Sequence, residues 1–326
     1  MDETNGSPRA LSRPAVLRSV FDSKLIFTFH GPNGLRAAWR LLIFSAVLAL
    51  VFDAARLLAR VITRPQPLSP VATLAPGFIA TGEAILFFIF LLASWIMARI
   101  EGRKMADYGL PLRRMFLGRF WLGAILGFVS ITVLLAALCA CGVFHFGPAQ
   151  LSGSAAWRYA GEWAVAFLSV GLFEEFAFRG YALFTLSTGI GFWPAALLAS
   201  ALFGYVHHGN SGETWTGALS AGAVGLLFCL LLRRTGDLWM PIGFHAAWDW
   251  GQTYFYGVPD SGITPQGHLF SANFSGPVWL TGGTVGPEGS WLCILLLALL
   301  WILFAAWLPQ AKYPDPAAIP DPRRPR

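Results

Sequence analysis

Charged residues are scarce in this 326-residue chain, at 12%, whereas hydrophobic residues make up 56%. Average soluble domains carry about 25% charged residues, so a soluble protein is excluded and a polytopic membrane protein is indicated. Cysteine is also rare, and its four residues lie in apolar segments without metal-type spacing. This placement disfavours a disulfide scaffold or a cysteine-bound metal, and the cysteines are interpreted as small buried hydrophobes.

A continuous basic stripe is missing too, although the net charge is +6. No nucleic-acid partner is therefore expected, because nucleic-acid binding uses clustered positive charge. No cleavable signal peptide is expected either, since the first apolar run starts only after Arg36 and Arg40.

Long apolar runs dominate the remaining chain, and a membrane helix needs about 20 such residues. The pattern predicts an all-α membrane bundle with about eight transmembrane helices. The expected segments are Ala37 to Leu58, Pro76 to Met97, Phe120 to Val143, Trp163 to Leu186, Phe192 to His208, Thr216 to Leu232, Leu238 to Tyr256 and Trp291 to Leu308.

Lysine and arginine placement predicts the orientation. With a cytoplasmic N-terminus, the opposite side receives only Arg60, Arg64 and Arg158. The cytoplasmic side then holds Arg9, Arg13, Arg18, Lys24, Arg36, Arg99, Arg103, Lys104, Arg113, Arg114, Arg119, Arg233, Arg234, Lys312, Arg323, Arg324 and Arg326. This bias favours a multi-pass protein of the cell membrane with both termini in the cytoplasm. The Gly/Pro-rich stretch 257–290 becomes an external loop.

Two adjacent glutamates, Glu174 and Glu175, interrupt the fourth apolar segment, and Arg179 follows. Ionisable groups at membrane depth are costly and usually functional. Glu175 and Arg179 are four residues apart and share a helix face, so they are expected to pair. Glu174 points about 100° away and is free to meet groups from other segments. In an apolar environment it is suited to act as a base.

Further polar groups stand in later segments. Phe203 is followed four residues later by His207, with His208 next to it, and His245 is followed four residues later by Asp249. A site inside the bundle takes only one of His207 and His208, which point about 100° apart. Together these groups can activate water and stabilise an oxyanion. If each segment crosses the membrane as a straight helix, His207 and His245 lie at different depths. A shared site therefore requires that these segments be re-entrant or tilted.

Other intramembrane charges are interpreted as structural. Asp53 and Arg56 in the first segment, and Glu83 in the second, are expected to pair between helices or to extend toward the interface.

At these residues the sequence resembles the CAAX-protease and bacteriocin-processing (CPBP) family of intramembrane endopeptidases, which includes Ras-converting-type CAAX prenyl proteases. Its Glu-Glu-x-x-x-Arg motif is matched by Glu174, Glu175 and Arg179. Its Phe-x-x-x-His motif is matched by Phe203 and His207, and its His-x-x-x-Asn/Asp motif by His245 and Asp249. The three motifs occur in family order on separate apolar segments.

The resemblance implies hydrolysis of a peptide bond in a membrane-embedded or prenylated peptide, within the lipid bilayer. Glu174 would be the general base, His207 would help to hold water, and His245 and Asp249 would stabilise the oxyanion. Glu175 and Arg179 would support them. Together with the composition, this predicts a cytoplasmic arm (1–36), three transmembrane helices (37–143), a CAAX-protease-like catalytic membrane domain (157–308) and a disordered tail (309–326). The first three helices and the external loop fall outside the resemblance.

Metal dependence is left open. The family commonly has Asn where this chain has Asp249, and a carboxylate donates a hydrogen bond only when protonated. The chain lacks His-Glu-x-x-His, the helix motif of zinc proteases. No cofactor is favoured, although Glu174, His207, His245 and Asp249 are acceptable zinc ligands by type.

Two alternatives belong to other functional classes. One is a proton-coupled transporter in which Glu174, Glu83 and the histidines form a relay; the missing internal repeat counts against it. The other is a catalytically inactive relative that binds peptides, for example as an immunity protein.

Overall fold

A computed structural model describes residues 30–31, 34–62, 75–210, 212–260 and 266–314 of the chain. Most of the predicted arm (1–36) and of the predicted tail (309–326) lies outside the described residues. The long helices are α2 (Ala37–Ile62), α3 (Pro76–Glu101), α4 (Gly118–Ala140), α5 (Gly153–Arg179), α7 (Phe192–His207), α8 (Trp215–Thr235), α9 (Trp239–Trp250) and α11 (Trp291–Trp307). Shorter elements are α6 (Tyr181–Ile190), α10 (Val278–Thr281), the π-turn η4 (Gly251–Phe255) and the 3₁₀ turns η2 (Met105–Tyr108), η3 (Leu112–Arg114), η5 (Gly283–Val285) and η6 (Pro287–Gly289).

The predicted all-α membrane bundle is confirmed. Four described helices, α2, α3, α4 and α8, are long and apolar enough to cross a membrane, and α7 and α11 are shorter apolar helices. The number of eight spans stays a prediction. Large apolar side chains such as Leu50, Ile125 and Leu303 are more than 60% exposed, which suits contact with lipid rather than water.

The fourth predicted segment is wrong in its bounds. The helix begins at Gly153, ten residues before Trp163, and ends at Arg179. At Gly180 the chain leaves the helical conformation, and Tyr181 starts the separate helix α6. Glu174 therefore lies near the C-terminal end of a 27-residue helix.

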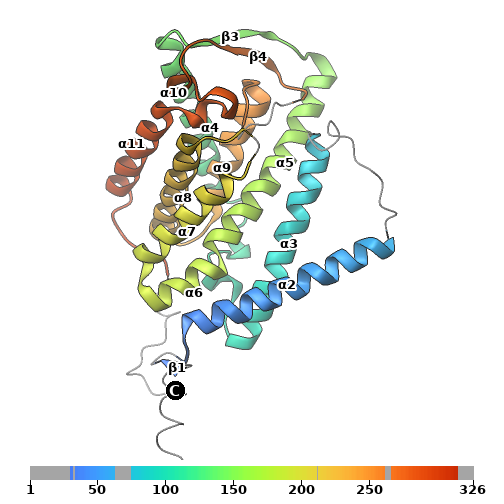
Figure 1. The fold of residues 1–326 in the computed structure, drawn as a ribbon, viewed down its shortest axis with the longest axis vertical. Coiled ribbons are helices and arrows are strands. Elements are labelled where there is room, and N and C mark those ends of the chain that lie inside the picture. Colours follow the sequence, from blue (N-terminus) through green and yellow to red (C-terminus); the bar gives the residue numbers. More distant parts are fainter. Residues whose placement is uncertain (1–29, 32–33, 63–74, 211, 261–265, 315–326) are drawn as a thin grey trace, which may run out of the picture.

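Most long helices run roughly along one axis, with α3 packed on α5 and α4 on α9 (Figure 1). The crossing of α4 and α9 is very close. A Cβ atom built on Gly127 would lie 2.1 Å from the Phe244 carbonyl oxygen, and one on Gly123 would lie 2.2 Å from that of Met240. From the other side, a Cβ on Gly243 would lie 2.1 Å from the Phe120 oxygen. Small residues allow such backbone contact between membrane helices, and here they fix the depth of α9.

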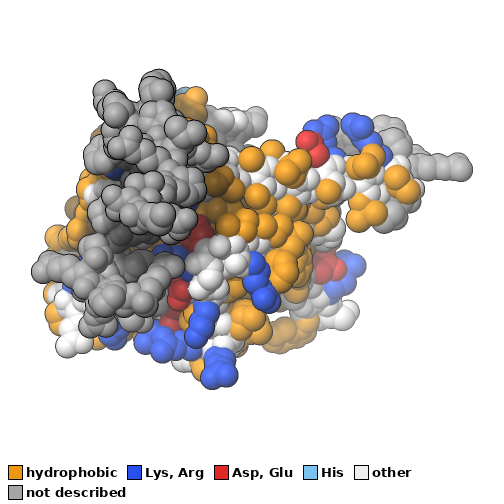
Figure 2. All heavy atoms as spheres, turned by 90° about the horizontal axis from the view of Figure 1, so that it is seen from below, with side chains coloured by type: hydrophobic (Ala, Val, Ile, Leu, Met, Phe, Trp, Pro, Cys, Tyr) orange, Lys and Arg blue, Asp and Glu red, His pale blue; other side chains and the backbone are white. Residues whose placement is uncertain are grey.

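Helix α2 departs from this arrangement, because it extends away from the bundle at a steep angle (Figures 1 and 2). Asp53 and Arg56 pair with each other at 3.9 Å on its exposed outer part.

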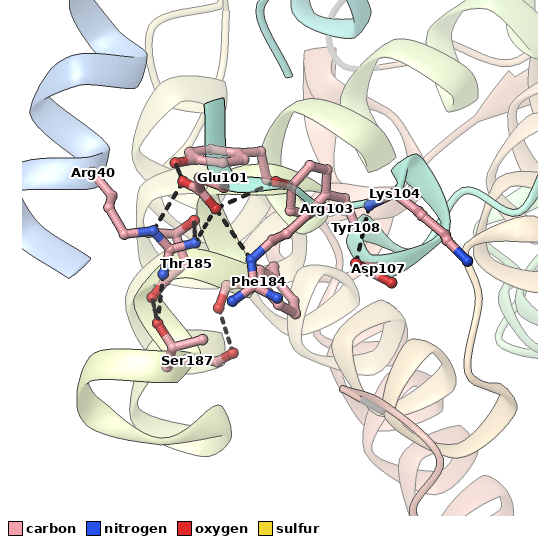
Figure 3. Close-up of polar contacts among 11 residues, drawn as sticks. Arg40, Glu101, Arg103, Lys104, Asp107, Tyr108, Phe184, Thr185 and Ser187 are labelled. Atoms are coloured by element: carbon pink, nitrogen blue, oxygen red, sulfur yellow. Dashed lines mark hydrogen bonds and ion pairs between the residues drawn. The ribbon is translucent and has the colours of Figure 1, made fainter. Parts of the chain in front are cut away.

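The start of α2 is held by a polar network around Glu101 (Figure 3). Arg40 donates from Nε and Nη2 to the two Glu101 carboxylate oxygens at 2.9 and 2.6 Å. Tyr181 donates to Glu101 at 2.5 Å, and Arg103 lies 3.2 Å from it. This bidentate arginine–carboxylate contact joins α2, α3 and α6.

One end of the bundle gathers the connections rich in basic residues. Asp237, between α8 and α9, is fully buried and pairs with Arg119 and, at 3.2 Å, with Arg114 from the α3–α4 connection. The Lys312 amide donates to the Arg233 carbonyl at 2.7 Å, which brings the C-terminal segment to the same end. Figure 2 shows Lys and Arg side chains on this end, which we call the basic face.

The opposite end carries an antiparallel pair of strands, β3 (Phe144–Ala149) and β4 (Phe270–Phe274), with Phe144 opposite Phe274 (Figure 1). The stretch 257–290, predicted as an external loop, supplies β4, α10, η5 and η6 at this end. A second short pair, β1 (His30–Gly31) with β2 (Gly34–Leu35), precedes α2. The 257–290 stretch therefore folds back over the ends of the helices that carry the predicted site.

Candidate active site

Helix α5 points its two adjacent glutamates in different directions. The Glu174 side chain is 21% exposed and lines a cavity of about 580 Å³ inside the bundle. The Glu175 side chain is fully buried, and its Oε1 lies 3.0 Å from Arg179 Nη1. The expected pairing one turn apart is therefore present, and it leaves Glu174 facing the cavity.

Glu175 has a second partner that the sequence did not reveal. His245 Nδ1 lies 2.9 Å from the same Oε1 atom, so the imidazole donates to this carboxylate. Arg179 is also buried and stacks over the rings of Phe203 and Phe228, with centroids 4.5 and 5.6 Å away. Glu175 thus links helices α5 and α9 and turns His245 Nε2 toward the cavity.

His207 is oriented by its own helix. Its Nδ1 lies 2.8 Å from the Phe203 carbonyl oxygen, which can only accept, so the proton is on Nδ1. Its Nε2 then faces the cavity, 3.9 Å from Glu174 Oε2. His208 instead stacks on Trp215, with ring centroids 3.9 Å apart. Only one of the two adjacent histidines enters the site.

Glu174 Oε2 lies between the two histidines, because His245 Nε2 is 3.8 Å from it on the other side. Asp249, one turn after His245 on α9, places Oδ2 3.4 Å from the same Nε2. The distances to Glu174 exceed a direct hydrogen bond, and a water in the cavity can contact Glu174 and an imidazole from the side. All four predicted side chains line the one cavity.

Straight transmembrane helices would place His207 and His245 at different depths in the membrane. The short helices α7 and α9 remove this difference. Helix α7 has 16 residues and ends at His207, so at about 1.5 Å per residue it reaches only part of the way across a membrane. His245 lies in the middle of α9, which starts at Trp239. Pro241 lies in the first turn of α9, where proline is tolerated.

Four further acidic residues line the cavity: Glu83, Glu213, Asp260 and Glu288. For Glu83 the sequence predicts pairing between helices or extension toward the interface, but its side chain lines the cavity and its buried Oε2 has no hydrogen-bond partner among the described residues. Glu213, Asp260 and Glu288 come from connecting segments that contain no recognisable motif, so no sequence pattern points to them. Of the four, only Glu83 is conspicuous in the sequence, because it is a charged residue deep in an apolar segment.

Three carboxylates meet at the end of the cavity formed by the connecting segments. Asp249, Asp260 and Glu288 each place an oxygen so that the three atoms lie within 4.8 Å of one another. Thr253 donates to Asp260 at 3.0 Å, and Trp248 Nε1 donates to Glu288 at 3.0 Å. We call these three residues the carboxylate cluster.

Burial and mutual repulsion affect protonation in this cluster. Burial and the neighbouring Asp249 raise the pKa of Asp260 well above its ordinary value. Burial and Asp260 raise the pKa of Glu288 to about 8, with Glu213 adding to the increase and the Trp248 hydrogen bond and His245 opposing it. Burial therefore disfavours the anionic forms of both carboxyls, and a nearby positive charge would favour them.

The helices that carry these side chains match a known protein family. Residues 156–251 match the family model described as Rce1-like, type II CAAX prenyl endopeptidase Rce1-like. This part of the chain is a CAAX-protease domain. It spans most of α5 to the end of α9, and it includes Glu174, His207, His245 and Asp249. No curated protein matches the chain.

The match supports an intramembrane protease family for residues 156–251. The matched residues cover less than a third of the chain. Helices α2 to α4, and the segment that carries Asp260 and Glu288, lie outside them. Part of the cavity wall is therefore supplied from outside the CAAX-protease domain.

Proposed function

We propose that the protein is an intramembrane endopeptidase that hydrolyses a peptide bond of a membrane-associated or prenylated peptide, with Glu174 as the general base. The observation that carries this proposal is the position of Glu174 Oε2, 3.9 Å from His207 Nε2 and 3.8 Å from His245 Nε2, on the wall of a cavity. A water molecule on the cavity side of these atoms contacts the base and an imidazole at once.

Glu174 takes a proton from that water while the water oxygen bonds to the scissile carbonyl carbon. His207, with its Nδ1 proton on the Phe203 carbonyl, accepts a hydrogen bond at Nε2 and orients the water. The carbonyl oxygen becomes an oxyanion. Glu174 then passes the proton to the leaving nitrogen as the carbon–nitrogen bond breaks, giving a carboxylic acid and an amine.

His245 and Asp249 stabilise the oxyanion together. His245 is flanked by Glu175 at 2.9 Å and Asp249 at 3.4 Å. A protonated imidazole in this position is balanced by carboxylates on both sides, and its Nε2–H can be donated to the oxyanion. Asp249 stabilises the protonated imidazole through its negative charge, which the amide of asparagine lacks. Glu175 and Arg179 are positioning residues.

No metal takes part in this proposal, because the base, the water-holding imidazole and the oxyanion donor are all side chains. Its test is direct: cleavage should continue after chelation, and purified active protein should contain no stoichiometric zinc.

Orientation and access follow from charge and geometry. The basic face is proposed to be cytoplasmic, with both termini on that side of the cell membrane. Among the described residues, the cavity wall includes the connecting segments at the opposite end, through Asn210, Glu213, Asp260, Val285 and Glu288. It includes no described residue of the connections at the basic face. The peptide is therefore proposed to enter from the non-cytoplasmic side.

The deciding experiment compares Glu174→Gln with Glu162→Gln in purified full-length protein. Both glutamates lie on α5, but Glu162 is exposed and pairs only loosely with Arg158, at 3.9 Å. Glu174→Gln should lower the cleavage rate of membrane-embedded peptides about 100- to 10,000-fold, the usual contribution of a general base. Glu162→Gln should cleave like the wild type. Equal activity of the two variants contradicts the proposal, and proton-coupled uptake lost in Glu174→Gln supports the transporter instead.

A further inference from the structure

The cavity has an unusual balance of charge. Two imidazoles line it, those of His207 and His245, and no lysine or arginine does among the residues that the structure describes. Six carboxyl side chains line it, those of Glu83, Glu174, Glu213, Asp249, Asp260 and Glu288. A cleft lined by one sign of charge concentrates ligands of the opposite sign. The proposed mechanism uses only two of these carboxyls directly.

The carboxylate cluster is already arranged as a set of acceptors. One oxygen of Asp260 accepts from Thr253 at 3.0 Å, and one oxygen of Glu288 accepts from Trp248 at 3.0 Å. These donors hold one oxygen of each carboxylate in place. The cluster also lies on the wall of the same cavity as Glu174, where the proposed mechanism places the peptide.

We propose that Asp249, Asp260 and Glu288 form a subsite that binds a positively charged side chain of the peptide substrate, with lysine preferred. This inference rests on the proposed endopeptidase function and adds the chemical class of the substrate. The geometry suits an ammonium group, which has three donors. At N···O distances of about 2.8 Å and tetrahedral angles, three acceptors lie about 4.6 Å apart. The three cluster oxygens lie within 4.8 Å of one another.

The subsite adjoins the reacting groups. Asp249 Oδ2 is 3.4 Å from His245 Nε2, and this nitrogen is 3.8 Å from Glu174 Oε2. The bound ammonium is therefore carried by a residue next to the cleaved bond or one position further along. Because Asp260 and Glu288 lie outside the CAAX-protease domain, the subsite is a feature of this chain's own connecting segments.

The experiment uses full-length protein in lipid nanodiscs and a set of membrane-anchored peptides that differ at one position. Lysine, arginine or norleucine is placed at each of the two positions on either side of the cleaved bond. Cleavage is measured as kcat/KM, and binding is measured separately as Kd with the Glu174→Gln variant. At one position, lysine should exceed norleucine about 10- to 100-fold in both measurements, the range expected for hydrogen bonds to a charged group.

Asp260→Asn and Glu288→Gln should each bring the lysine-to-norleucine ratio down toward one. Glu213→Gln is the matched control, because it removes a cavity carboxylate outside the cluster and should leave most of the ratio. If Glu213→Gln lowers the ratio as much as Glu288→Gln does, the preference belongs to the whole cavity and the subsite is refuted.

Other results also overturn the inference. Equal kcat/KM and equal Kd for lysine and norleucine peptides at every position refute it. So does an unchanged ratio in both cluster variants, or a stoichiometric divalent ion bound by the wild type and lost in Glu288→Gln. If no peptide is cleaved, the proposed endopeptidase function fails. The Kd ratio then still decides whether the cluster binds a cationic side chain.

Discussion

The close crossing of α4 and α9 allows a sharp test of how the site is held. Gly127 faces the backbone of Phe244, the residue before His245. In Gly127→Ala the new Cβ would lie 2.1 Å from the Phe244 carbonyl oxygen, whereas ordinary contact begins at 3.4 Å. Both partners are helix backbone, so no flexible side chain can move aside. The difference of 1.3 Å must be met by displacing one helix from the other.

The expected effect on catalysis follows from that displacement. A shift of about 1 Å in a reacting group can cost about 100-fold in rate, and His245 moves with the helix backbone next to it. Overpacking of this kind usually destabilises a protein by about 1–3 kcal/mol. Gly127→Ala is therefore expected to fold at reduced stability and to lose about 100-fold in kcat/KM.

The assay measures the amount of protein in membranes, thermal unfolding in detergent, and peptide cleavage per folded molecule. Gly82→Ala is the control, because Gly82 lies within helix α3 and a Cβ there has nothing within 4 Å. This variant should be as active as the wild type and slightly more stable, since alanine favours helices by about 1 kcal/mol over glycine. Normal activity and stability of Gly127→Ala would show that the contact between α4 and α9 does not position His245.

Three other predictions concern buried charges. Glu175→Ala should reduce folded protein more than Glu175→Gln, because it leaves the fully buried Arg179 without its carboxylate, at about 3–5 kcal/mol; equal accumulation in membranes and equal unfolding temperatures would contradict this. Asp237→Asn should lower the unfolding temperature, because the fully buried Asp237 carboxylate holds Arg114 of the α3–α4 connection and Arg119 at the start of α4; an unchanged unfolding temperature in detergent would contradict it. The lysine preference should increase as the pH rises through about 8, where the pKa of Glu288 is raised by burial and by Asp260, because the carboxyl is neutral below that pH and anionic above it. Ratios of kcat/KM for lysine and norleucine peptides at about pH 6 and about pH 9, on either side of that pKa, measure this effect, and a constant ratio would contradict it.

The sequence alone was enough to predict the membrane bundle and the bounds of most helices, because long apolar runs in this chain have few stable alternatives in lipid. It also indicated the pairing of Glu175 with Arg179, since helical periodicity places residues four apart on one face. The predicted bounds of the fourth segment were wrong because apolar residues continue past Gly180. The apolar pattern alone does not show that the helix ends at Arg179.

Tertiary structure decided what surrounds Glu174. His207 and His245 lie on helices whose relative depth depends on the short length of α7 and on the glycine contacts between α4 and α9. Asp260 and Glu288 reach the same cavity only because the 257–290 stretch folds back over the helix ends. Helical periodicity is a local property and can be read from neighbouring residues. The return of a Gly/Pro-rich connection depends on contacts between residues far apart in the chain, such as that of Glu288 with Trp248, and these contacts exist only once the helices have packed.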